Sequence, residues 1–332
     1  MAALLSIRNL KTIFYTEEGQ VKASDNINLD LAEGKTVGLI GETGCGKSVL
    51  GLSILRLLPR NASIKGNIFY KEQDLLQLTD EQMRQLRGKE IALIPQSPST
   101  SLNPVLKIGF QITEALQLHQ KLAQKKAQKV AVDMLRFLNL PDPEKRVLEY
   151  PHQLSGGMKQ RILAAIGMAG KPSLLIADEP TKGLDAVLRV QVVEVLRQLT
   201  QKTGAAMLLI THDLKVAASL CDEIAVMYAG EIVEHGQTPQ VLTDPSHPYT
   251  GALLASLPSN GLHPIPGYSP SLINLPFGCK FYLRCKQAQD ICSKKRPPLE
   301  KTNGRYVRCM FFAQSREPQE SLHNRDLQKT VV

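Results

Sequence analysis

The sequence predicts an α/β protein, and three observations lead to this class. A short apolar run, 36–40, is followed at once by a glycine-rich loop and then by a helical pattern over 49–58. Two more runs, 173–177 and 207–210, are apolar throughout and end in polar residues. Continuous apolar runs of this length are typical of strands buried on both faces of a sheet. Residues 1–34 instead alternate apolar and polar positions, which predicts antiparallel strands.

The segments between these landmarks carry weaker signals of the same kinds. Residues 67–70 and 90–94 predict strands on either side of a polar helix over 79–87. From about 107 to 154 the pattern is helical. Basic residues along this stretch predict a solvated helix face; they are Lys121, Lys125, Lys126 and Lys129.

Length and composition predict about two domains with a proper core, since the chain has 332 residues and is 43% hydrophobic. No apolar run approaches the roughly 18 residues that a membrane helix needs. The apolar start, residues 1–7, is too short for a signal peptide. We therefore expect a cytosolic chain whose membrane role, if any, comes through partner subunits.

The charge and the cysteines are unevenly distributed. The net charge is +9, from 40 basic and 31 acidic residues, which taken alone could indicate nucleic-acid binding. Most of the excess, however, lies in residues 279–309, which hold nine Lys or Arg and only two acids. Four of the six cysteines share that segment. In a reducing compartment such a cluster indicates metal binding rather than disulfides.

The glycine-rich loop after the run 36–40 reads G-x-x-x-x-G-K-S, the P-loop pattern, in the strand–loop–helix context that this motif requires. Glycines let successive N–H groups face one anion, and the helix N-terminus adds partial positive charge. Lys47 can then reach the outer phosphates, and the Ser48 hydroxyl can bind Mg²⁺. The candidate nucleotide-binding residues of the loop are Gly41, Glu42, Thr43, Gly44, Cys45, Gly46, Lys47 and Ser48.

Polar residues follow three other predicted strands, where side chains at the carboxyl ends of an α/β sheet reach a ligand. Asp178 is placed to hold Mg²⁺ through water, and Glu179 to act on water as a general base. His212 can donate a hydrogen bond to a γ-phosphate, and Gln96 can contact Mg²⁺ or the attacking water. Upstream, Phe14 or Tyr15 in a turn-like stretch either stacks on an adenine ring or packs in the sheet.

A second anion-binding helix start is predicted far from the first in sequence. Ser155, Gly156 and Gly157 open a helix over 158–169, which leaves backbone N–H groups exposed at its N-terminus.

Together these motifs resemble the ATP-binding subunits of ABC transporters. The resemblance covers residues 1 to about 250, with a Walker A motif at 41–48, a signature at 154–158 and a Walker B motif at 174–178. Gln96 corresponds to the Q-loop residue, Asp185 to the D-loop aspartate and His212 to the switch histidine; Glu179 follows Walker B. The implied fold is a RecA-like core sheet with an antiparallel β subdomain and a helical subdomain at about 97–168.

Further motifs resemble the dipeptide and oligopeptide import branch, which also includes nickel and other metal-complex importers; they are 99–104, 227–230, 245–250, 264–267 and 275–281. The resemblance implies an ATP-binding domain over 1–255 and a Cys-rich extension over 256–332. The chain departs from the family at Thr43 and Cys45, where Ser is usual, and at Lys182 before the D-loop. The first two are interior loop positions, so we expect phosphate binding to persist.

The resemblance also implies partners and a place in the cell. A second ATP-binding subunit, expected to be a paralogue, would pair head to tail, so that Ser155, Gly156 and Gly157 of one chain cap ATP on the other. Two membrane permeases and an extracytoplasmic substrate-binding protein would complete the importer, with this chain peripheral at the cytoplasmic face. The rival hypothesis, a soluble ABC ATPase acting on nucleic acid, normally involves two cassettes or long coiled coils, and the sequence has neither.

The four clustered cysteines, Cys279, Cys285, Cys292 and Cys309, are spaced C-x5-C-x6-C-x16-C. Structural zinc sites usually bring ligands in close pairs, which this spacing lacks, whereas iron–sulfur clusters accept wider spacings. Unliganded cysteines and zinc remain alternatives on this pattern. Resemblance to importer subunits that carry this extension implies a structural [4Fe–4S] cluster in addition to ATP and Mg²⁺.

Overall fold

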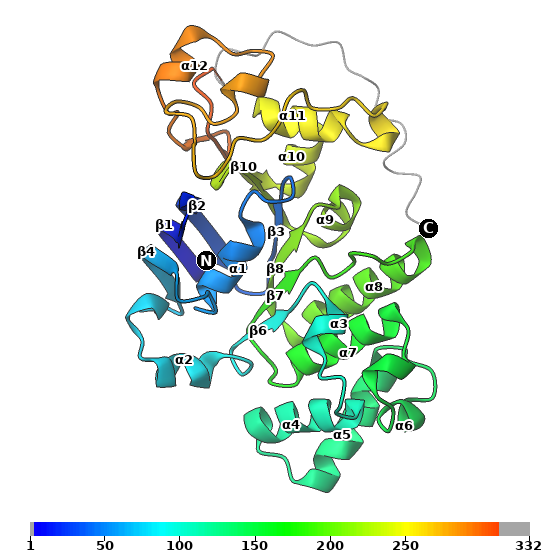
Figure 1. Cartoon of the computed structure of the whole chain (residues 1–332). Coiled ribbons are helices and arrows are strands. Elements are labelled where there is room, and N and C mark those ends of the chain that lie inside the picture. Colours follow the sequence, from blue (N-terminus) through cyan, green and yellow to red (C-terminus); the bar gives the residue numbers. More distant parts are fainter. Residues whose placement is uncertain (1–2, 312–332) are drawn as a thin grey trace.

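The computed structural model describes residues 3–311. Its centre is an eight-stranded mixed sheet with the order β11-β12-β10-β9-β3-β8-β7-β6 (Figure 1). Five neighbouring strands are parallel: β3 (Thr36–Ile40), β6 (Ile91–Ile94), β7 (Leu174–Asp178), β8 (Ala206–Thr211) and β9 (Glu223–Tyr228). The continuous apolar runs are therefore confirmed as strands of a parallel sheet.

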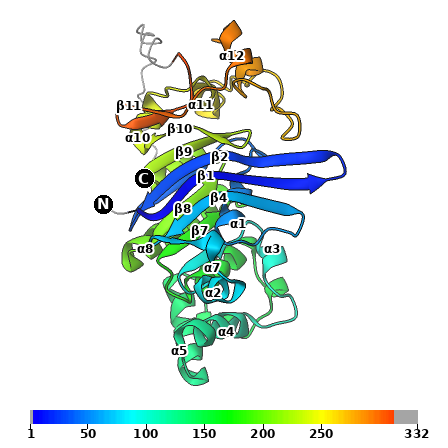
Figure 2. The ribbon, with the colours of Figure 1, turned by 90° about the vertical axis from the view of Figure 1, so that its left-hand side faces the viewer.

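A second, antiparallel sheet with the order β2-β1-β4-β5 covers one face of the first (Figure 2). Its strands are β1 (Ala3–Thr16), β2 (Gly19–Ala32), β4 (Ala62–Tyr70) and β5 (Gln73–Asp74). The alternation of residues 1–34 is thus confirmed. The turn predicted around Phe14 and Tyr15 is wrong, because both residues belong to β1, where Phe14 pairs with Val21 and Ala62.

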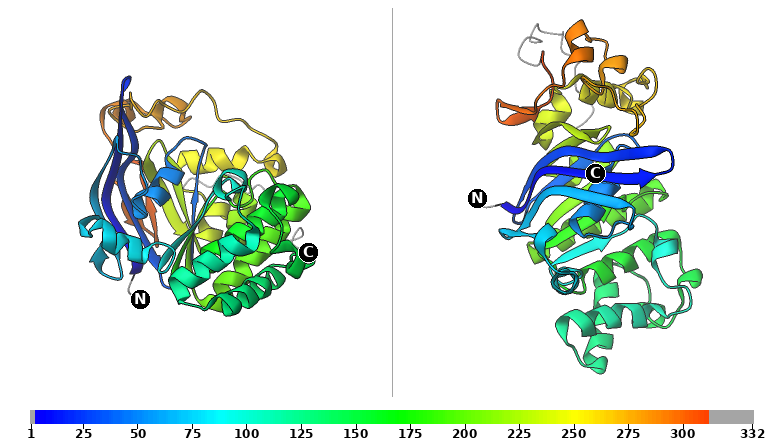
Figure 3. Two further views of the ribbon diagram at one scale, coloured as in Figure 1. Left: turned by 60° about the horizontal axis from the view of Figure 1, so that its bottom comes forward. Right: turned by 60° about the vertical axis from the view of Figure 1, so that its left-hand side comes forward.

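Helices cover the other face of the central sheet and one of its ends (Figure 3). They are α7 (Gly156–Met168), α8 (Ala186–Thr203), α9 (Leu214–Leu220) and α10 (Thr238–Thr243). Helices α1 (Lys47–Ile54) and α2 (Asp80–Leu86) instead pack on the side of the antiparallel sheet. Helix α1 ends four residues earlier than predicted. Arg56 adopts a left-handed φ of 51°, and its guanidinium donates to the carbonyls of Leu75 and Leu78 at 3.2 and 2.6 Å. This interaction turns the chain away from the helix axis.

The helical stretch after β6 forms a separate lobe at one end of the molecule (Figure 1). It contains α3 (Pro98–Ser101), α4 (Ile108–Gln120), α5 (Gln124–Phe137) and α6 (Pro143–Arg146). The predicted solvated face is confirmed, since Lys125, Lys126 and Lys129 on α5 are all exposed. No helix in the described part of the chain is long and apolar enough to cross a membrane.

The core is divided by the central sheet, and β8 shows how. Leu208 and Ile210 belong to the apolar cluster under the antiparallel sheet, which also contains Leu50 of α1. Met207 and Leu209 belong to the cluster on the helical side. Because successive side chains of a strand point to opposite faces, a strand buried on both sides must be apolar at every position.

The C-terminal part lies at the opposite end of the molecule from the helical lobe (Figures 1 and 2). After β10 (Glu231–Gln237) and α11 (Pro248–Ala255) the chain is mostly irregular, apart from α12 (Asp290–Lys294) and two short strands. These strands, β11 (Glu300–Thr302) and β12 (Arg305–Val307), extend the central sheet because β12 pairs antiparallel with β10. Of the predicted extension 256–332, residues 312–332 lie outside the described residues.

Glu234, a fully buried carboxylate on β10, connects the C-terminal part of the chain to the central sheet. Its two oxygens accept the backbone N–H groups of Ser246 and His247 at 2.8 and 2.9 Å, just before α11. Arg305 of β12 lies 3.5 Å from the same carboxylate. One side chain therefore joins three separate segments.

We expect Glu234→Ala to lower the free energy of unfolding by about 3 kcal/mol, because it leaves two buried N–H groups without an acceptor and removes a carboxylate from Arg305. Urea denaturation followed by circular dichroism measures the change. Glu17→Ala, at an exposed position in the β1–β2 turn, is the matched control. A loss below about 0.5 kcal/mol, the usual range for surface substitutions, would contradict the anchoring role.

Candidate functional site

The glycine-rich loop between β3 and α1 is pressed against two backbone segments. A Cβ atom at Gly41 would lie 2.1 Å from the carbonyl oxygen of Met227, and one at Gly46 would lie 2.0 Å from that of Ala23. Both glycines also have positive φ angles, 151° and 108°. Only glycine fits such positions. The loop is consequently held in one place at the N-terminus of α1, where helix N–H groups favour an anion.

Lys47, the first residue of α1, folds back over the loop. Its ammonium donates to the carbonyls of Gly41 and Glu42 at 2.7 and 2.9 Å. The side chain of Cys45 is buried and belongs to the core under the antiparallel sheet, and its Sγ lies 3.9 Å from the Lys47 ammonium. The Cys that stands where Ser is usual therefore packs against this core at the base of the loop.

Asp178, at the end of β7, meets Ser48 across the loop, with its Oδ1 accepting the Ser48 hydroxyl at 3.0 Å. Burial raises the pKa of Asp178, and the Ser48 hydrogen bond only partly opposes this shift. A buried carboxylate and a hydroxyl side by side are the hard oxygen donors that Mg²⁺ prefers, and a cation there would stabilise the charged carboxylate. These two residues therefore fit a magnesium site.

Glu179 and His212 lie side by side at the same sheet edge. The His212 Nδ1 is 2.8 Å from both Glu179 oxygens, and Thr211 donates to Oε2 at 3.4 Å. Glu179 is almost buried while the His212 side chain is half exposed. Glu179 also has a left-handed φ of 47°, a strained conformation that clusters at functional sites. A carboxylate oriented by a histidine in this way can accept a proton from a bound water.

The order of the parallel strands brings the predicted residues together. The strands β3, β8, β7 and β6 are neighbours, and they lead into the loop, His212, Asp178–Glu179 and Gln96 respectively. Thr211 lies beside Ile40, and Asp178 lies beside Ile210 in the register. The prediction that these polar residues share one sheet edge agrees with the geometry.

The predicted signature residues belong to a different surface. Ser155 caps α7 by accepting the N–H of Met158 at 3.4 Å, and both Ser155 and Gly156 are exposed. Gly157 packs against Leu188 of α8. Asp185 caps α8 by accepting the N–H of Leu188 at 2.9 Å. The starts of α7 and α8 thus form one exposed surface.

The sequence did not predict a set of hydrogen bonds to Glu42, which fix the phosphate loop to the C-terminal part of the chain. The backbone N–H of Glu42 donates to the Tyr249 hydroxyl at 3.0 Å. The Glu42 carboxylate accepts two hydrogen bonds from Arg284, at 2.8 and 2.9 Å, and one from Ser269. Burial alone would raise the pKa of Glu42, but these hydrogen bonds outweigh it and hold the pKa below its usual value. Glu42 is therefore charged and paired.

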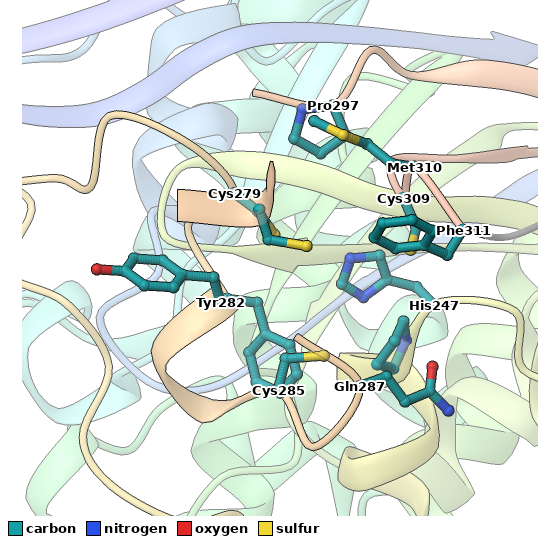
Figure 4. A pocket seen from close by; sticks show the side chains of 12 residues that line it. His247, Cys279, Tyr282, Cys285, Gln287, Pro297, Cys309, Met310 and Phe311 are labelled. Carbon is teal, nitrogen blue, oxygen red and sulfur yellow. The ribbon is translucent and has the colours of Figure 1, made fainter. Parts of the chain in front are cut away.

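The four clustered cysteines line one pocket in the C-terminal part (Figure 4). Figure 4 shows the sulfur atoms of Cys279, Cys285 and Cys309 around the same space. Burial raises the pKa of Cys279 to about 12, and the other three thiols add to this shift. His247 also lines the pocket; burial lowers its pKa to about 3, so its ring is neutral and Nδ1 accepts the N–H of Tyr249.

Four cysteines around one pocket are a donor set that an iron–sulfur cluster can take. No three His, Cys, Asp or Glu side chains within residues 3–311 are grouped so as to hold one ion. Four thiolates on one zinc would each be about 2.3 Å from the metal and hence close together. A cubane cluster instead takes one thiolate at each of four separate corners. Four cysteines around a shared pocket match the second arrangement.

Basic residues next to three of these cysteines face away from the pocket and into the body of the protein. Lys280, Arg284 and Arg308 are all at most 8% exposed. Lys280 pairs with Asp25 and Glu231 at 3.2 and 3.4 Å, and Arg308 approaches Glu231 at 3.9 Å. Part of the local excess of positive charge therefore neutralises carboxylates of the central sheet and of β2.

The sequence matches two known families. The family described as ABC transporter matches residues 24–182, and the family described as oligopeptide/dipeptide transporter, C-terminal region, matches residues 233–292. The probable peptide ABC transporter ATP-binding protein y4tR of Sinorhizobium fredii is 44% identical over 304 residues, covering 89% of this chain and 91% of that protein.

Two proteins of Bacillus subtilis are similar to the same extent. The oligopeptide transport ATP-binding protein OppD is 44% identical over 90% of this chain and 86% of its own. The dipeptide transport ATP-binding protein DppD is 43% identical over 90% and 91%.

Solved structures agree on the fold. The dimeric ATP-binding cassette MJ0796 in a post-hydrolysis state, bound to ADP and Pi, matches with a TM-score of 0.64 at 24% identity. The match covers 70% of this chain and 98% of that one. The predicted α/β cassette fold is confirmed.

Proposed function

The chain belongs to the ATP-binding subunits of ABC transporters, in the peptide-import family, and from this premise we propose that it hydrolyses ATP to drive the uptake of dipeptides or oligopeptides across the cytoplasmic membrane. The observation that carries the proposal is the shared sheet edge. There the phosphate loop, the Ser48–Asp178 pair and the Glu179–His212 pair lie together. Peptides are favoured over nickel as cargo because the three relatives named above, y4tR, OppD and DppD, are all described as ATP-binding proteins of peptide transport.

Binding of ATP is assigned to the loop. Backbone N–H groups at the start of α1 receive the phosphates, and the Lys47 ammonium exchanges its loop carbonyls for phosphate oxygens. Ser48 and Asp178 would hold Mg²⁺, which supplies positive charge to the phosphates when bound. Gln96, two residues beyond β6, is proposed as a further magnesium or water contact.

Hydrolysis is assigned to Glu179 with His212. Glu179 accepts a proton from the attacking water, and His212 holds the carboxylate in its orientation through Nδ1. This arrangement leaves the exposed side of the His212 ring available for a γ-phosphate oxygen. The chemistry is therefore mostly positioning and electrostatic stabilisation, as is usual for phosphoryl transfer.

Pairing with a second cassette is supported by the exposed starts of α7 and α8. Ser155, Gly156 and Gly157 would cap the ATP held by the partner, and Asp185 would communicate between the two sites. We propose a head-to-tail dimer with a paralogous subunit, peripheral at the cytoplasmic face. Two membrane permeases and an extracytoplasmic binding protein would complete the importer.

The C-terminal pocket is proposed to hold a [4Fe–4S] cluster through Cys279, Cys285, Cys292 and Cys309. The support is the one pocket that all four cysteines line. The cluster would be structural, because this part of the chain has little regular secondary structure and the ATP motifs lie elsewhere.

Glu179→Gln should retain ATP binding and lose turnover by about 10²- to 10⁴-fold, because an amide cannot accept the proton of the attacking water. Single-turnover hydrolysis and equilibrium binding of ATP measure the two properties separately. Glu17→Gln, at an exposed site, is the control. Near-normal turnover in the Glu179 variant would remove it from the proposed role.

Ser155→Arg and Lys47→Ala should distinguish ATP binding by the isolated chain from ATP hydrolysis by the assembled transporter. Lys47→Ala removes a charge from the phosphates and should weaken ATP binding to the isolated chain. Ser155→Arg lies on the exposed start of α7, so the isolated chain should bind ATP normally while the assembled transporter loses most of its hydrolysis. The shared-site arrangement is refuted if Ser155→Arg abolishes binding to the isolated chain.

Anaerobically purified protein should be brown, with a broad absorbance near 400 nm and about four irons per chain. Cys292→Ala should lose most of the colour and iron, while Cys221→Ala, a buried cysteine outside the pocket, should keep both. Colourless protein with one zinc or without metal would refute the cluster and leave the ATPase assignment intact.

A further inference from the structure

An arginine connects the phosphate loop with the four-cysteine pocket. Arg284 donates to both oxygens of Glu42 in the loop, and the next residue, Cys285, lines the pocket. The two sites are far apart in sequence, since 242 residues separate Glu42 from Arg284. A movement of the backbone around Cys285 would therefore reach the phosphate loop directly.

Glu42 lies where its charge matters for nucleotide binding. Its backbone carbonyl accepts from Lys47 at 2.9 Å, and the Lys47 charge also acts on its carboxylate. An unpaired carboxylate in this loop would attract Lys47 and repel the phosphates of ATP. Arg284 neutralises this carboxylate and holds it to the outside of the loop.

Two further hydrogen bonds fix the orientation of Arg284. Its Nε donates to the carbonyl of Pro266 at 2.9 Å, and Nη1 donates to the Tyr228 hydroxyl at 3.3 Å. Its side chain is only 6% exposed, and the guanidinium lies 5.8 Å from the centre of the Tyr228 ring. A planar guanidinium held by these two hydrogen bonds presents its paired donors to a carboxylate in one direction.

An aromatic cluster makes a second connection between the two sites. Phe281 lines the pocket and packs edge-on against Tyr228 and Tyr249, with ring centres 5.3 and 5.4 Å apart. Tyr228 contacts Arg284, and the Tyr249 hydroxyl accepts the backbone N–H of Glu42. His247, also in the pocket wall, lies 6.0 Å from Phe281. Both the side chain and the backbone of Glu42 are thus bonded by residues that adjoin the pocket wall.

We propose that the four-cysteine part of the chain sets the affinity for ATP, with Arg284 as the positioning residue that keeps Glu42 turned away from the phosphates. The occupied pocket holds Phe281 and the backbone at Cys285 in place, and these hold Arg284. A pocket without its four-thiolate group loosens Arg284 and leaves the Glu42 charge in the loop. This inference rests on the ATP binding proposed above and extends it to regulation.

The first arm of the test measures equilibrium binding of Mg-ATP to the full chain. Arg284→Met should raise the Kd about tenfold, which corresponds to about 1.4 kcal/mol. Adding Glu42→Gln to that variant should restore most of the affinity, because the repelling charge is gone although the pair remains broken. Arg284→Lys, which keeps the charge but loses the fork, should give an intermediate Kd. Arg60→Met, at an exposed position, is the matched control.

The second arm links the pocket to the same residue. Cys292→Ala, at a pocket cysteine that is not adjacent to Arg284 in the chain, should raise the Kd to a similar extent in the otherwise native chain. In the Arg284→Met background it should add little, because both changes act through one contact. Circular dichroism of each variant establishes that it is folded, and iron content is measured on the same samples.

The outcomes separate this inference from the proposed function. Failure of the unaltered chain to bind Mg-ATP would refute the proposed function itself. With normal binding in that chain, three results would each overturn only the inference: an unchanged Kd in Arg284→Met, an unchanged Kd in Cys292→Ala, or full additivity of the two changes. Rescue by Glu42→Gln is the result that a merely structural arginine would not give.

Discussion

The site depends on the close approach of the phosphate loop to the backbones of β2 and of β9. Met227 and Ala23 present carbonyl oxygens so near to Gly41 and Gly46 that no side chain fits between them. The loop therefore has one position relative to both sheets. This position determines the direction of Lys47, the contact of Ser48 with Asp178 and the place where α1 begins. The antiparallel sheet, which includes β2, is thus part of the frame of the nucleotide site.

Strand order supplies the second half of the frame. Parallel strands all end at the same edge, so residues that follow β8, β7 and β6 meet the loop that follows β3. The order places His212 between the loop and Glu179, where its ring can bond the carboxylate. The left-handed backbone of Glu179 is maintained because its N–H donates to the Ile210 carbonyl at 2.8 Å. Strain at this residue is therefore balanced by the neighbouring strand.

Much of this arrangement could be predicted because it is encoded locally. Apolar runs mark strands covered on both faces, and polar residues directly after them must lie at the sheet edge. The end of α1 could not be predicted, because it depends on Arg56 reaching carbonyls about 20 residues away. The role of Arg284 could not be predicted either, because in the sequence it is one of nine basic residues around the cysteines. Only the fold brings it to Glu42, because the pairing of distant charges leaves no periodic signal.

The positions of the buried cations explain why the C-terminal part can act on the loop at all. Buried ion pairs contribute little net stability against apolar replacements, but an uncompensated partner is costly, so they select one arrangement over others. Lys280 and Arg308 are matched to carboxylates of β2 and β10, and Arg284 to the loop. Each of the three adjoins a pocket cysteine along the chain. Docking is consequently specific at three points, and a change within the pocket is transmitted to those points rather than absorbed by a flexible surface.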